Sequence, residues 1–174
     1  VDRDGLRLAL ARANLESVGL GEGADWLQAD LLQLPLDLGR IPPGSAAFFD
    51  PARRQDGRRI FSVERYAPPL SIIEAWLPHL PSLGVKLSPG VDLAELDGYP
   101  AEVEFISLRG ELKEAVLWFG PLRTASRRAT VLSNWPPARG TQEGDLLEGA
   151  HSLAVDHRLD YPRLPLSDPL VWLY

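Results

Sequence analysis

The chain has 174 residues, of which 45% are hydrophobic and 24% are charged, proportions typical of a globular protein rather than a disordered one. Its formal net charge of -6 argues against binding nucleic acid by overall charge alone, and its lack of cysteine excludes disulfides, thiolate zinc sites and cysteine nucleophiles. The three histidines are too scattered to predict a metal site, and no apolar run approaches the roughly 20 residues of a membrane helix, so we expect a cytoplasmic protein with no metal and no membrane partner.

The N-terminal part predicts a helix followed by short strands. Asp4 is placed to cap a helix that ends near Gly19, because small and apolar residues recur after it at helical spacing. Short strands are expected over residues 25–29 and 46–49, with a proline-containing loop between them. The chain lacks methionine and opens inside what reads as the end of a strand, which predicts that further residues precede Val1.

The middle of the chain predicts most of a β-sheet and its covering helices. The expected elements are a helix over residues 70–77, a strand over 83–87, a short helix over 93–96, and strands over 101–108 and 114–119. The last two strands flank Arg109-Gly110-Glu111 and predict a hairpin at the edge of the sheet. Alternating strands and helices with an antiparallel end predict an α/β fold.

The composition changes beyond Gly120. One strand is expected over residues 127–132, and the last stretch is rich in proline and in acidic side chains. We therefore predict two domains, residues 1–120 and residues 121–174, with a boundary near residues 120–125.

Three acids stand at the ends of three successive predicted strands: Asp2, Asp30 and Asp50. Ligands of open α/β sheets bind beyond the carboxyl ends of the strands, where one acid can hold ribose hydroxyls and the next polar group can face an adenine. Each acid taken alone also fits a structural role, Asp2 as a strand-end residue and Asp30 as a turn former. Their common spacing favours a cofactor site.

The segment Asp50-Pro51-Ala52-Arg53 is the candidate for the substrate side of this site. Its acid or its backbone carbonyls would face a substrate, and its proline would stiffen the turn, which matters because a misplaced catalytic group loses its effect. The structural alternative is a strand-to-turn junction with solvated arginines. Arg54, Arg58 and Arg59 follow in a locally basic stretch, where they would contact the phosphates of an RNA or remain solvated.

Lys86 is unusual, because a lysine within a buried strand must reach a cleft, a carboxylate or water. We expect it to pair with a neighbouring acid. Glu111 and Glu114 lie near Lys113 and are expected to make solvated contacts in the hairpin. Four tryptophans are expected in the core rather than in a site: Trp76, Trp118, Trp135 and Trp172.

These residues together resemble the class I S-adenosylmethionine-dependent methyltransferases, entered after the first strand of that fold. Val1-Asp2-Arg3-Asp4-Gly5 with Ala11-Arg12-Ala13-Asn14 is similar to the acid of the second strand and the helix that follows it. Ala29-Asp30 is similar to the acid on the adenine side, and Asp50-Pro51-Ala52-Arg53 stands in the place of the catalytic motif after the fourth strand.

The resemblance implies a Rossmann-like fold and S-adenosyl-L-methionine as the cofactor. It implies that Asp2 with Arg3 would lie at the ribose hydroxyls, and Asp30 with Leu31 at the adenine. It also implies that Asp50-Pro51-Ala52-Arg53 would face the substrate.

A narrower resemblance covers nearly the whole chain. Four ordered motifs are similar to those of bacterial methyltransferases that carry a THUMP-like domain after the catalytic one. They are Phe49-Asp50-Pro51-Ala52-Arg53-Arg54, Pro68-Pro69-Leu70-Ser71, Val85-Lys86-Leu87-Ser88-Pro89-Gly90 and Gly110-Glu111-Leu112-Lys113-Glu114-Ala115-Val116-Leu117-Trp118. The resemblance implies a methyltransferase domain over residues 1–120, a small α+β THUMP-like domain over residues 121–174, a chain truncated at both ends, and RNA as the partner.

Two departures from the family pattern keep a second hypothesis open. The glycine-rich loop that follows the family's first strand is absent from these residues, and Asp50-Pro51-Ala52-Arg53 lacks the aromatic with which amino-methylating relatives stack a flipped base. The alternative to an enzyme is therefore a non-catalytic RNA-binding or assembly module on a methyltransferase-like scaffold.

Overall fold

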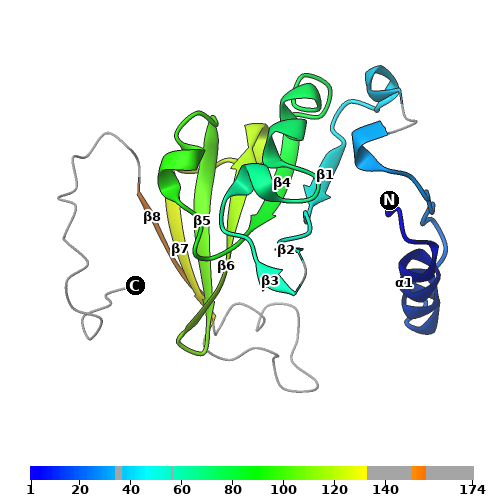
Figure 1. Ribbon diagram of the computed structural model, residues 1–174, viewed down its shortest axis with the longest axis horizontal. Coiled ribbons are helices and arrows are strands. Elements are labelled where there is room, and N and C mark those ends of the chain that lie inside the picture. Colours follow the sequence, from blue (N-terminus) through cyan, green and yellow to red (C-terminus); the bar gives the residue numbers. More distant parts are fainter. Residues whose placement is uncertain (34–36, 56, 133–149, 156–174) are drawn as a thin grey trace. The chain divides into compact units, whose positions relative to one another are not determined.

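A computed structural model describes residues 1–33, 37–55, 57–132 and 150–155, and Figure 1 shows its elements. The chain divides into two compact units, Val1–Ile41 and Pro42–Tyr174, and each is described by itself. Among the described residues, no helix has the length and apolar character needed to cross a membrane.

The first unit confirms the N-terminal helix. Helix α1 spans Gly5–Ser17, and the carboxylate of Asp4 caps it by accepting the backbone N–H groups of Leu6 and Arg7. Gly19 follows with a φ of 74°, the left-handed conformation that commonly ends a helix and that glycine adopts without steric cost.

The strand expected over residues 25–29 is shorter than predicted. It is reduced to a parallel bridge between Asp2 and Gln28, because α1 begins soon after Asp2 and leaves little extended backbone to pair. Two short 3-10 helices, η1 (Leu31–Gln33) and η2 (Leu38–Arg40), complete the unit.

The second unit is built on a mixed β-sheet. Its described strands, in spatial order, are β1 (Ala46–Phe49), β4 (Ser82–Leu87), β6 (Glu111–Phe119), β5 (Ala101–Leu108), β7 (Arg127–Leu132) and β8 (Ala150–Val155). The pairs β1–β4 and β5–β7 are parallel, whereas β4–β6, β6–β5 and β7–β8 are antiparallel. The mixed α/β architecture and the strands predicted for this part of the sequence are confirmed.

Short elements connect the strands of the sheet. They are the hairpin strands β2 (Arg54–Gln55) and β3 (Arg58–Arg59) and the 3-10 helices η3 (Val63–Arg65), η4 (Leu70–Ala75), η5 (Leu93–Leu96) and η6 (Gly120–Leu122). The helix predicted over residues 70–77 is therefore a 3-10 helix followed by turns. Helical hydrogen bonds continue in these turns, from the N–H of Leu77 to the carbonyl of Ile73 at 2.9 Å and from the N–H of Leu80 to the carbonyl of Trp76 at 2.8 Å.

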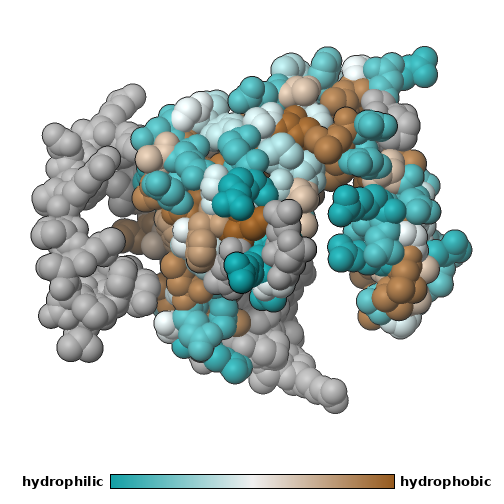
Figure 2. All heavy atoms as spheres, in the orientation of Figure 1, coloured by the Kyte–Doolittle hydropathy of each residue, from teal (hydrophilic) through white to brown (hydrophobic). Residues whose placement is uncertain are grey.

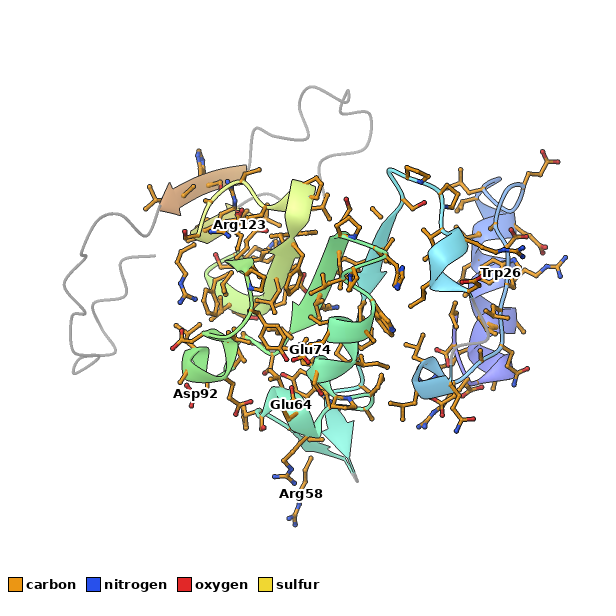
Figure 3. The ribbon with its side chains drawn as sticks, turned by 90° about the horizontal axis from the view of Figure 1, so that it is seen from above. Trp26, Arg58, Glu64, Glu74, Asp92 and Arg123 are labelled. Atoms are coloured by element: carbon orange, nitrogen blue, oxygen red, sulfur yellow. The ribbon has the colours of Figure 1, made fainter. Side chains whose placement is uncertain are left out.

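The core lies on one face of the sheet. Alternate side chains of neighbouring strands point to the same side, and the register places Val85 opposite Leu117 and Leu117 opposite Val103, all of them buried. The ring of Phe49 packs edge-on against Trp76, with 5.2 Å between ring centroids, which brings the segment after η4 onto this face. In Figure 3 the labelled residues Glu64, Glu74 and Asp92 mark η3, η4 and the start of η5, which lie on one side of the sheet.

The predicted hairpin of β5 and β6 is confirmed, but its predicted place at the edge of the sheet is wrong. β5 pairs with β6 on one side and with β7 on the other, where Val103 lies opposite Arg127. An edge strand presents unpaired N–H and C=O groups, and β7 satisfies those of β5. The predicted boundary near residues 120–125 stays a prediction, and most of residues 121–174, expected to form the THUMP-like domain, lie outside the described residues.

A buried carboxylate holds β7 and the loop before it. Glu102 is 1% exposed and accepts the backbone N–H groups of Thr124 and Ala125 at 2.6 and 2.7 Å and the Nε of Arg128 at 2.5 Å. Burial acts to raise the pKa of this carboxyl group, but the hydrogen bonds and the positive charge of Arg128 outweigh it, so the pKa of Glu102 lies below its ordinary value. The ionised form is therefore the one that stabilises the fold.

We expect Glu102→Gln to destabilise the protein at neutral pH, because the amide keeps the shape of the side chain but removes the charge that pairs with Arg128. A group whose pKa is depressed by folding contributes stability that is present above its unfolded pKa and lost as the pH falls through its folded pKa. Urea unfolding at pH 7 should show a loss of about 3 kcal/mol, the low end for breaking a buried ion pair. The difference from the unaltered protein should shrink below the ordinary pKa of 4.5.

The matched control is Glu111→Gln, which removes an exposed carboxylate paired with Lys113 on the same hairpin. Exposed pairs contribute little, so its unfolding midpoint should barely move. A loss for Glu102→Gln that matches the control, or that persists unchanged at acidic pH, would contradict the role of the charge.

Candidate functional site

Two parallel strands of the second unit end side by side. β1 and β4 pair with Phe49 opposite Val85, so the residues beyond them lie at one edge of the sheet, where ligands of α/β proteins bind. At this edge the Nζ of Lys86 lies 3.5 Å from Oδ2 of Asp50 and 3.4 Å from Oε2 of Glu114. The expected pairing of Lys86 with a neighbouring acid is confirmed, and Asp50 is one of its two partners.

The contact of Glu114 is different from the expected one. Lys113 pairs with Glu111 near the turn of the hairpin, whereas Glu114 reaches Lys86 on the neighbouring strand. The register of β6 shifts at this point, because Ile106 pairs with Glu114 and Ser107 with Leu112, so Lys113 is the extra residue of a bulge. Glu114 therefore belongs to the strand-end cluster, a role that its place in the sequence next to Lys113 concealed.

The loop Asp50-Pro51-Ala52-Arg53 is held on two sides. Ala52 exchanges backbone hydrogen bonds with Ala67 at 3.0 and 3.1 Å, and Nη1 of Arg53 donates to the carbonyl of Leu87 at 2.8 Å. The guanidinium of Arg53 thus links the end of β1 to the end of β4 and is not a freely solvated side chain. The fixed loop gives Asp50 a defined position beside the strand ends.

Tyr66 and Ser88 join the same cluster, although the sequence did not single out either as a site residue. Tyr66 is 3% exposed, and its hydroxyl oxygen accepts the backbone N–H of Ser88 at 3.2 Å. Burial raises the pKa of Tyr66 above 10.0, partly opposed by that hydrogen bond and by the charge of Arg53, so the phenol is neutral at physiological pH. The buried hydroxyl of Ser88 has no hydrogen-bond partner among the described residues.

The predicted RNA-contacting arginines lie on a small hairpin that continues from this loop. β2 and β3 pair with Arg54 opposite Arg59 and Gln55 opposite Arg58, and Gly57 in the turn has a φ of 77°. The side chains of Arg54 and Arg58 are exposed, and Figure 3 shows Arg58 projecting away from the sheet. In Figure 2 hydrophilic residues cover this hairpin.

The cofactor candidates belong to the first unit. The backbone of Asp2 bonds to Leu27 and to Ala29, each at 3.1 Å, so the structure brings the segments that carry Asp2 and Asp30 together, with both acids at the same end. One carboxylate oxygen of Asp2 accepts the N–H of Asp4 at 2.8 Å, and one of Asp30 accepts the N–H of Leu32 at 2.9 Å. These bonds agree with the purely structural roles that the sequence also allowed, Asp2 as a strand-end residue and Asp30 as a turn former. They also fix the direction of both carboxylates.

Arg3 and Leu31 stand directly beside these two acids. Arg3 is exposed and its carbonyl accepts Nε2 of Gln28 at 3.2 Å, and Leu31 begins η1. A role for either residue in cofactor binding stays a prediction. Within the described ranges, no group of three or more histidine, cysteine, aspartate or glutamate side chains could hold a metal ion.

We expect Lys86→Met to destabilise the second unit, because it leaves the carboxylates of Asp50 and Glu114 facing each other without the ammonium between them. Adding Glu114→Gln should recover part of the loss, since neutralising one of the two carboxylates abolishes the repulsion between them. Urea unfolding of the two single variants and the double variant at low salt should give a coupling of about 1 kcal/mol.

The corresponding cycle on Lys113 and Glu111 provides the control, because that pair is more exposed. It should show no measurable coupling. Additive effects of Lys86→Met and Glu114→Gln would mean that the lysine does not link the strand ends.

Comparisons with known proteins bear on the class of protein to which the chain is similar. No protein-family model matches the chain. Proteins from two strains of Mycobacterium tuberculosis, each named an uncharacterized S-adenosylmethionine-dependent methyltransferase, are 36% identical to it over an alignment of 149 residues that covers 83% of this chain. The chain spans 37% of the length of these curated relatives. The similarity supports the class of S-adenosylmethionine-dependent methyltransferases for the matched part of the chain.

Proposed function

We propose that the protein transfers a methyl group from S-adenosylmethionine to an RNA nucleotide, with residues of the first unit contributing to cofactor binding and residues of the second unit to substrate binding. The observation that carries the proposal is the 36% identity to proteins named S-adenosylmethionine-dependent methyltransferases over 83% of the chain. The strand-end acids support it, because carboxylates suit ribose hydroxyls and an adenine amino group.

The residues of the loop would act by positioning. The bound cofactor would supply an electrophilic methyl group on its sulfonium. Asp50 or a carbonyl of its loop would orient the acceptor for in-line displacement, and Asp50 would be kept in place by Lys86. The hydrogen bond from Arg53 to Leu87 would keep the loop from shifting, which matters because a displacement of about 1 Å can cost a hundredfold in rate.

The arginine hairpin supports RNA as the substrate. Arg54 and Arg58 are exposed, and neither takes part in an ion pair between described residues. Exposed arginines beside a substrate loop suit a phosphate backbone, which binds through charge and positions the bases. This local positive charge distinguishes the hairpin within a chain whose net charge is -6.

Calorimetric titration of the full-length protein with S-adenosylmethionine tests the cofactor. We expect Asp2→Ala and Asp30→Ala each to weaken binding by about tenfold, the effect of losing one hydrogen bond to a charged group. Asp37→Ala is the control. Asp37 lies in the same unit, and its carboxylate accepts a backbone N–H at η2 just as the carboxylate of Asp30 does at η1. Absence of binding, or equal effects of all three variants, would overturn the proposal, and RNA binding without cofactor binding would favour the non-catalytic module.

The salt dependence of RNA binding tests the hairpin. We expect the double variant Arg54→Gln/Arg58→Gln to reduce the slope of log K against log salt by about 1.4 for a single strand, since each phosphate contact contributes about 0.7. Arg12→Gln/Arg40→Gln removes the same charge from exposed arginines paired with acids of the first unit and should leave the slope unchanged. The same slope change in both double variants would assign the effect to net charge rather than to the hairpin.

A further inference from the structure

An exposed aromatic ring stands at the base of the arginine hairpin. Phe61, two residues beyond β3, is 54% exposed, although burying a phenylalanine side chain is worth about 2 kcal/mol. Its neighbours in the sequence are a buried isoleucine, Ile60, and the half-buried Ser62, so the ring is a single aromatic surface and not part of a larger apolar run.

The backbone on both sides of the ring is fixed. The N–H of Ile60 donates to the carbonyl of Arg53 at 2.9 Å, and the N–H of Val63, which is fully buried, donates to Oε2 of Glu95 at 2.8 Å. The segment that carries Phe61 is therefore tied to the substrate loop at one end and to η5 at the other.

Gly90 supports the ring from one side. A β-carbon on Gly90 would lie 3.1 Å from Cε1 and 3.3 Å from Cδ1 of Phe61, which shows that the ring lies close against this glycine. Gly90 follows β4 by three residues, and Leu87 at the end of that strand accepts the hydrogen bond of Arg53. Phe61 is thus connected through short contacts to both strand ends of the candidate site.

We propose that Phe61 is a stacking platform for a base of single-stranded RNA, with the backbone of that strand on Arg54 and Arg58. This inference rests on the RNA part of the proposed function. Proteins that bind single strands combine a positive track for phosphates with aromatic rings on which bases stack. Here Arg54 and Arg58 would provide the track and Phe61 the ring, and the three residues lie close together in the sequence. An isolated exposed ring that follows two exposed arginines in the sequence suits a planar base on a polyanion better than the apolar face of a protein partner.

The test is the binding of a fluorescent single-stranded oligouridine of about 12 nucleotides to the full chain, followed by anisotropy. Phe61→Leu should weaken binding by about 5- to 150-fold, the range for losing one base–aromatic stack, with no change in the salt slope, because no charge is lost. Phe61→Trp, which keeps an aromatic ring at this position, should bind as the unaltered protein does. Phe48→Leu is the matched control, because Phe48 is 58% exposed on β1, and it should bind as the unaltered protein does.

The outcomes separate this inference from the proposals on which it rests. RNA binding that is equally affected by Phe61→Leu and Phe48→Leu, or that Phe61→Trp impairs as much as Phe61→Leu, overturns the platform and leaves the arginine contacts standing. Failure of the unaltered protein to bind the oligonucleotide overturns both the platform and the RNA substrate. Failure to bind S-adenosylmethionine overturns the methyl transfer alone, since the stacking readout needs no cofactor.

Discussion

The parallel pairing of β1 with β4 is the constraint on which the candidate site depends. Parallel strands end at the same edge of a sheet, so two segments far apart in the sequence, one after Phe49 and one after Val85, are brought together there. The ion pair of Lys86 with Asp50 and the hydrogen bond of Arg53 to Leu87 are possible only in this register. A shift by one residue would turn each side chain to the opposite face.

Two charged groups inside the sheet, Lys86 and Glu102, are tolerated because each is matched by partners. Lys86 lies between two carboxylates, and Glu102 accepts hydrogen bonds from Thr124, Ala125 and Arg128. An unpaired charge in the same places would carry a desolvation cost of several kcal/mol. The two clusters have different consequences: one orders the strand ends of the site, and the other holds β7 against β5.

Several elements that carry candidate residues follow from local patterns in the sequence. Strand β1 and the turn after it follow from an apolar run that stops at Asp50-Pro51, and the N-cap of α1 follows from Asp4. The pairing of Lys86 with an acid followed from the cost of burying an ammonium group. The contacts of Glu114, Tyr66 and Phe61 were not predicted, because they arise from strand register and from the packing of loops.

By itself the sequence determined where most elements lie and which acids are candidates for a site, because periodicity, caps and prolines act over a few neighbouring residues. Only the tertiary structure decided which strands are neighbours. The hairpin of β5 and β6 lies inside the sheet because β7 pairs with β5. Local sequence patterns do not specify which strand pairs with which. The tertiary structure likewise decided that Arg53 braces the loop, because a long side chain finds its acceptor only after the sheet has formed.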